Sequence, residues 1–63
     1  MKTLDVYARI YKTGIIEFSW IGDYREHKSY SGYSFKEAIR AFKEAMKIDF
    51  PNTKIEIVET IEY

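Results

Sequence analysis

Few side chains in this sequence could carry acid–base, nucleophilic or metal chemistry. His27 is the only histidine among 63 residues, and the sequence contains no cysteine. A nucleophile needs a base within hydrogen-bond reach, and a metal needs several ligands at suitable spacing; neither pattern can be assembled around His27. Asp5 and Glu17 could share one neighbourhood on a sheet, but Glu17 has better-placed basic partners. We therefore expect no enzyme, no metal site and no cofactor.

His27 and the glycines have simpler structural interpretations. A lone histidine on a polar strand is usually a solvated surface residue, although a two-residue turn before that strand would place His27 against Phe18. Gly14, Gly22 and Gly32 are well separated and do not form the glycine-rich loop that cradles phosphates. We expect them to lie where elements end.

Aromatic, aliphatic and basic residues share one face of the predicted sheet. Tyrosine gives a large contact area at low entropy cost, so such a face suits docking to a protein or stacking on bases. The alternative is a solvated face on which aromatic residues serve as good strand formers. The candidate partner-binding face comprises Tyr7, Arg9, Tyr11, Ile15, Ile21, Tyr24 and Tyr30, with Glu17 and Ser19 among them.

A second candidate surface is a basic stripe on the predicted helix. Its members follow one another at spacings of four, three and four residues, which places them on one side of a helix. Phosphate contacts could use this stripe, whereas an ordinary solvated helix face is the alternative. The basic helix stripe consists of Lys36, Arg40, Lys43 and Lys47, flanked by Glu37 and Glu44.

Two alternating strands must carry the tyrosine face. Residues 3–11 and 15–21 alternate apolar and polar side chains, the pattern of a half-buried strand. A two-residue loop between them would pair Ile10 with Glu17 and split the apolar faces. A three-residue loop with Gly14 in the left-handed conformation brings the faces together. This register predicts the pairs Ile10–Ile16, Ala8–Phe18, Val6–Trp20 and Arg9–Glu17.

A third strand is expected after Gly22-Asp23, which is a tight-turn signal. A two-residue turn would lead into a strand over residues 24–30 and place Lys28 opposite Glu17. Arg9, Glu17 and Lys28 would then form a ladder across three strands. Because this strand is polar, we expect it at an edge of the sheet.

The helix and the last strand complete the fold. Ser34 and Glu37 have the spacing of a capping box, and apolar residues recur at helical spacing from Phe35 onward. The helix should end near Ile48 or Asp49, because Pro51 follows. Residues 54–63 form a last strand, which places Ile55, Ile57, Ile61 and Tyr63 on one face, with Val58 on the other.

These elements predict a single α+β domain over residues 1–63. A three-stranded antiparallel meander is followed by one amphipathic helix and a final strand, in the order β-β-β-α-β. Since the helix must return the chain, the last strand should lie parallel to the first. The sheet order is then third, second, first and last strand, with the helix on one face and the other face uncovered.

Charge and composition narrow the class of protein. Ten basic residues balance ten acidic ones, which argues against a dedicated duplex-DNA binder. No apolar run approaches the ~20 residues of a membrane span, and the first residues lack the apolar region of a signal peptide. Lack of cysteine is consistent with a reducing compartment, so we expect a cytoplasmic protein that does not enter a membrane.

The region around the helix start resembles a known family. Gly32, Ser34, Glu37 and Ala38, with Ala45 further along, resemble the N-terminal domain of HicB-type antitoxins. That resemblance implies a β-β-β-α-β, partial ribonuclease-H-like fold without catalytic carboxylates. It also implies direct binding to a small RNA-cleaving toxin. The same pattern is similar to small uncharacterised bacterial proteins.

Three functional hypotheses follow. The first is a non-catalytic module for protein–protein interaction, such as an inhibitor or antitoxin-like factor. The second is binding of RNA or single-stranded nucleic acid, with bases stacked on Tyr7 and Tyr11 beside Arg9. The third is self-association, for example as a homodimer, through an unpaired edge strand or the tyrosine face. Another protein is the expected partner, ahead of nucleic acid.

Overall fold

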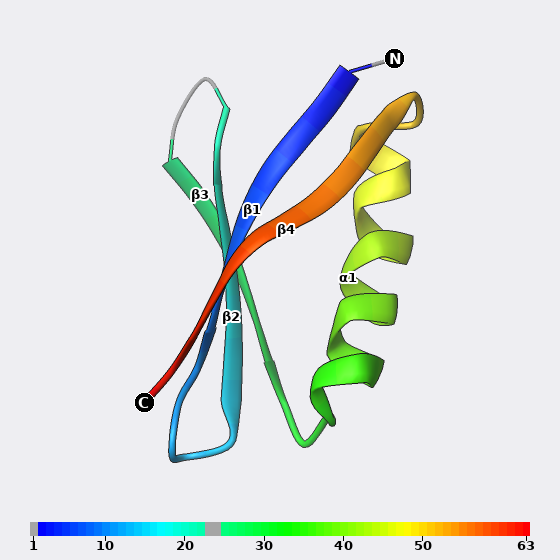
Figure 1. Ribbon diagram of the computed structural model, residues 1–63. Coiled ribbons are helices and arrows are strands. Elements are labelled where there is room, and N and C mark those ends of the chain that lie inside the picture. The colour runs from blue at the N-terminus through cyan, green and yellow to red at the C-terminus, as the bar shows by residue number, and fades with distance from the viewer. Residues whose placement is uncertain (1, 23–24) are drawn as a thin grey trace.

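The computed structural model describes residues 2–22 and 25–63. These residues contain four strands and one helix. The first three strands, β1 (Lys2–Ile10), β2 (Ile15–Ile21) and β3 (Arg25–Ser31), precede helix α1 (Phe35–Asp49) and strand β4 (Thr53–Glu62) (Figure 1). They form one mixed sheet in the order β3-β2-β1-β4, with β4 parallel to β1. The predicted fold class and strand order are confirmed.

The β1–β2 hairpin has the predicted register. Ile10 pairs with Ile16 and Ala8 with Phe18, so the apolar side chains of both strands fall on the same face. Gly14 has a φ of 91°, the left-handed conformation that the three-residue loop requires. The backbone N–H of Tyr11 donates to the carbonyl of Ile15 at 2.9 Å, which closes the hairpin next to this loop.

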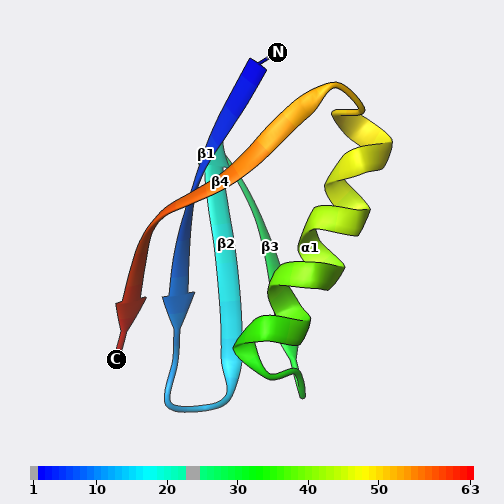
Figure 2. The same ribbon diagram turned by 45° about the vertical axis from the view of Figure 1, so that its right-hand side comes forward.

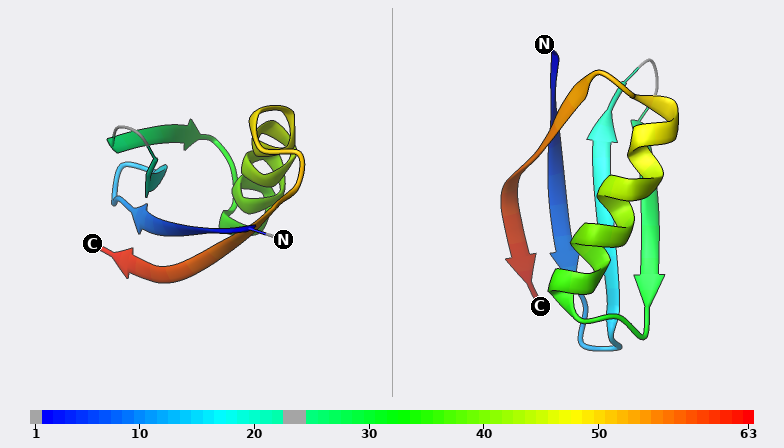
Figure 3. Two further views of the ribbon diagram at one scale, coloured as in Figure 1. Left: turned by 90° about the horizontal axis from the view of Figure 1, so that it is seen from above. Right: turned by 90° about the vertical axis from the view of Figure 1, so that its right-hand side faces the viewer.

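The helix covers one face of a strongly twisted sheet (Figures 2 and 3). Phe18 lies at the centre of the resulting core, with its ring stacked on that of Phe42 at a centroid distance of 4.5 Å. Trp20 packs against the same Phe42 ring at 5.6 Å. Among the residues whose burial the structure describes, the fully or almost fully buried ones come from β1, β2 and α1: Val6, Ala8, Ile16, Phe18, Trp20, Ala38, Phe42 and Met46.

The register of β3 differs from the prediction by one residue. Ile21 pairs with Arg25, so three residues separate the paired positions instead of two. A one-residue shift moves every side chain of a strand to the opposite face. Glu17 therefore faces Ser29, and the predicted Arg9–Glu17–Lys28 ladder is wrong beyond its Arg9–Glu17 step.

This shift moves two residues of functional interest. Tyr30, predicted on the open face, lies on the helix side opposite Ile16, and its ring meets Phe18 edge-on at 5.9 Å. His27, which the two-residue turn would have set against Phe18, instead lies exposed opposite Ser19 on the open face.

Strand β4 contains a bulge that the sequence pattern did not reveal. Val6 pairs with Ile57, but Tyr7 pairs with Glu59, so Val58 is an extra residue. A bulge of one residue reverses the faces of everything after it. Ile61 and Tyr63, predicted on the same face as Ile55 and Ile57, therefore move to the open face.

The helix start is fixed by the predicted capping box. The Glu37 backbone N–H donates to Ser34 Oγ at 3.2 Å, and the Ser34 backbone N–H donates to Glu37 Oε1 at 3.0 Å. The backbone hydrogen bond, and then the Ser34 side chain, lower the pKa of Glu37 below its ordinary value. Because the folded-state pKa is lowered, this stabilisation is present above the unfolded-state pKa and is lost as the pH falls through the folded-state value.

Replacing Ser34 with alanine removes the acceptor for the Glu37 backbone N–H. We expect the free energy of unfolding to fall by about 1 kcal/mol, the usual cost of losing an N-cap. Urea unfolding followed by circular dichroism measures it, with Ser29→Ala on an exposed position of β3 as the matched control. Equal stability of the two variants would show that the box does not stabilise the helix.

Candidate functional site

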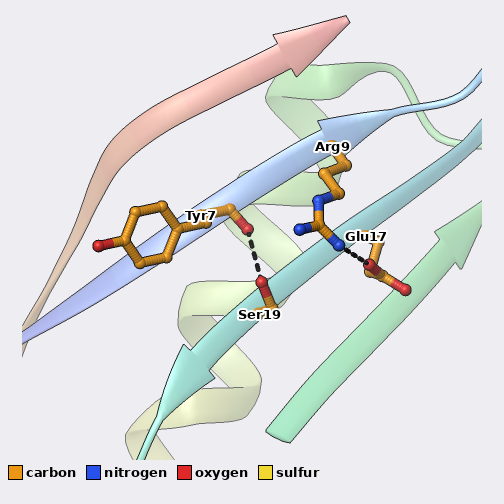
Figure 4. Close-up of polar contacts among 4 residues, drawn as sticks. All are labelled: Tyr7, Arg9, Glu17 and Ser19. Carbon is orange, nitrogen blue, oxygen red and sulfur yellow. Dashed lines mark hydrogen bonds and ion pairs between the residues drawn. The ribbon is translucent and has the colours of Figure 1, made fainter. Parts of the chain in front are cut away.

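The open face of the sheet, on the side opposite α1, is the candidate binding surface. Alternation along β1 and β2 directs Tyr7, Arg9, Glu17 and Ser19 away from the buried core (Figure 4). Arg9 Nη1 lies 3.4 Å from Glu17 Oε1, and Ser19 Oγ is 3.5 Å from the carbonyl oxygen of Tyr7. The Arg9–Glu17 pair is the cross-strand contact that the hairpin register predicts.

A hollow of about 600 Å³ lies on this face. It combines apolar walls with acidic, basic and hydroxyl groups, the mixture that a docking site for a side chain uses. Residues of all four strands line it: Tyr7, Arg9, Glu17, Ser19, Trp20, Ile21, His27, Glu59 and Ile61.

Two tyrosine rings cover the end of the face near the hairpin loop. Tyr11 and Tyr63 stack at a centroid distance of 5.1 Å and an interplanar angle of 12°. The Tyr63 backbone N–H also donates to the carbonyl of Ile10 at 2.9 Å, which ties the C-terminal end of β4 to β1. A side-chain hydrogen bond with Tyr11, followed by the charge interaction with Tyr63, raises the pKa of Arg9 above its ordinary value. Arg9, like any arginine, is positively charged at neutral pH.

The predicted face residues divide into three groups. Tyr7, Arg9 and Ile21 line the hollow. Ile15, 40% exposed, and Tyr11 lie on the same face nearer the hairpin loop. Tyr30 is on the helix side, as described above, and Tyr24 lies outside the described residues.

The structure adds residues that sequence reasoning missed. Glu59 and Ile61 line the hollow because of the β4 bulge, and His27 does so because of the β3 shift. The one available signal for the bulge was Glu59 itself, a charged residue interrupting an otherwise apolar alternation.

The basic helix stripe is exposed, as its spacing predicts. All four members lie on the solvent side of α1, and Lys47 Nζ is 3.7 Å from Glu44 Oε1. This stripe and the open face lie on opposite sides of the sheet, so they cannot contribute to one site. Its members are Lys36, Arg40, Lys43 and Lys47.

Within residues 2–22 and 25–63, no three histidine or carboxylate side chains come together as a metal would require. Across the same residues, no helix has both the length and the apolar character to cross a membrane. Fold and surface together define a small α+β protein with one packed and one open sheet face. No family model matches the sequence, and no curated protein or solved structure shows significant similarity to it.

Proposed function

We propose that this chain is a non-catalytic binding module that docks a partner protein on the open sheet face. The observation that carries the proposal is the hollow between Tyr7, Ile21 and Ile61, which mixes apolar walls with charged groups. Protein interfaces place aromatic and aliphatic anchors in such pockets and surround them with polar groups.

Exposed apolar side chains on the same face support this proposal. Ile21 is 68% exposed, Tyr63 57%, and Tyr7 40%. Single exposed apolar residues are ordinary, but several on one face beside a hollow are typical of an interaction surface. A partner that covers them would gain the free energy of burying this area.

The charges on this face favour a protein over a nucleic acid. Arg9, which lines the hollow, is already paired with Glu17, and Glu59 adds a further negative charge. Phosphate backbones need cations that are free to replace counterions. The exposed helix stripe is the remaining surface for phosphate contacts, and that second hypothesis stays a prediction.

An inhibitor or antitoxin-like role is the specific form of the proposal that the HicB resemblance supports. The residues behind the resemblance, Ser34 and Glu37 among them, lie at the helix start and not in the hollow. They support a shared element order, while the open face supplies the argument for binding.

Photocrosslinking in the native host tests the proposal directly. A benzophenone amino acid replacing Ile21, which lines the hollow, is expected to form a discrete adduct with another protein. The matched control replaces Ile48, which is 83% exposed on α1. Absence of a protein adduct from Ile21, or the same adducts from both positions, would contradict the proposal.

A further inference from the structure

We infer that the open face receives a cationic segment of the partner, one that carries lysine or arginine beside apolar side chains. This inference rests on the proposed function and specifies the chemistry of the partner. The evidence for it is the position of the carboxylates relative to the hollow.

Three carboxylates gather where β1 meets β4. Asp5 lies beside Glu56 in the parallel register, and Glu59 lies beside Tyr7 on the same face. All three are exposed, and none forms an ion pair within the part of the chain that the structure describes. Lys54 lies two residues before Glu56, beside Thr3, and contributes one positive charge. The three carboxylates outnumber it, so this edge of the face has an excess of negative charge.

The hollow offers a long basic side chain both an apolar surface and a carboxylate. Lysine and arginine bury an aliphatic stem against apolar surface while the charged head stays near polar groups. Tyr7 and Ile61 provide the apolar surface, and Glu59 provides the carboxylate. A guanidinium or ammonium group over the Tyr7 ring would also gain a cation–π interaction.

An anionic partner would meet the opposite situation. Its charge would approach Glu59 and the neighbouring carboxylates, and Arg9, which lines the same hollow, already has Glu17 Oε1 at 3.4 Å from its Nη1. Like charges brought together at an interface weaken binding and exclude that partner. The charge pattern thus selects cationic segments.

A second copy of this chain fits less well than a different protein. Among the described residues, the four cations of the basic helix stripe lie together on the side of the sheet opposite the hollow. Docking one copy's helix on the next copy's open face would leave each end of the stack unsatisfied. Such head-to-tail contacts give open chains and not a closed dimer.

Amide chemical shifts of the full chain test the inference with defined probes. The blocked peptide acetyl-Leu-Arg-Lys-Leu-amide is compared with acetyl-Leu-Glu-Glu-Leu-amide and with a short oligothymidylate. We expect saturable shifts only with the cationic peptide, centred on Tyr7, Ser19 and Glu59, and weaker binding as salt is added. Binding of the acidic peptide or the oligonucleotide at this face, or shifts from the cationic peptide elsewhere, would overturn the inference.

Charge-removing variants test the role of the carboxylates. Glu59→Gln and Glu56→Gln are each expected to raise the Kd of the cationic peptide about twofold to fivefold, the effect of losing a single exposed ion pair. Glu44→Gln makes the same charge change on α1 and should leave affinity unchanged. If Glu59→Gln and Glu56→Gln both bind as tightly as Glu44→Gln, the inference fails. A protein adduct from position 21 would still uphold the proposed function in that case.

Discussion

Replacing Phe18 with alanine is expected to remove a large part of the free energy of unfolding of this domain. Phe18 is 0% exposed, and its ring contacts Phe42 at 4.5 Å, Tyr30 at 5.9 Å and Phe35 at 6.4 Å. Truncating a buried phenylalanine costs about 3–5 kcal/mol. At roughly 0.05–0.15 kcal/mol per residue, a domain of this size has only about 3–9 kcal/mol of stability in total.

Urea unfolding followed by far-ultraviolet circular dichroism checks this result. Phe18→Leu keeps most of the volume and should therefore cost less than Phe18→Ala. Ser19→Ala changes the next residue, on the other face of β2, and should stay within about 0.5 kcal/mol of the unmodified chain. If Phe18→Ala were as stable as Ser19→Ala, the core would not be centred where the structure places it.

The sequence was sufficient to predict the hairpin because two independent constraints agree there. Apolar alternation in β1 and β2 favours the one register that places the apolar side chains of both strands on the same face. Gly14 permits the loop that gives this register. The helix is equally well specified, since Ser34 and Glu37 mark its start and the apolar stripe its buried side. Element order then leaves little choice for the sheet.

The third strand could not be placed correctly because it carries almost no hydrophobic pattern. Glu26 and Lys28 face the helix side, while His27 and Ser29 face the open side, so polarity alone does not distinguish the two registers. Polar edge strands specify their register weakly. In the structure Tyr30 packs against Phe18, and the Trp20 Nε1 hydrogen donates to Glu26 Oε2 at 3.1 Å. Such tertiary contacts cannot be read from local sequence.

The sequence predicted which face of the sheet holds the candidate site, but not all of the residues that line it. Tyr7, Arg9 and Ile21 were placed on the open face from β1 and β2 alone. Glu59 and Ile61 were not, because a bulge depends on how β4 pairs with β1 and leaves only a break in alternation as its trace. The acidic character of the hollow therefore emerges only from the assembled sheet.

One face of the sheet is packed against α1 and the other is open, and thiol labelling of two neighbouring residues tests this arrangement. The chain has no cysteine, so single substitutions give a clean signal. Ala8 is 1% exposed on the packed face, whereas Tyr7 is 40% exposed on the open face. At low protein concentration, Tyr7→Cys should react with a maleimide nearly as fast as in the unfolded chain.

Ala8→Cys should react at least about 100-fold more slowly, because its thiol becomes accessible only when the chain opens at a cost of about 3 kcal/mol or more. Urea should abolish the difference. Equal labelling rates in the folded protein, or faster labelling of Ala8→Cys than of Tyr7→Cys, would contradict the arrangement on which the binding face depends.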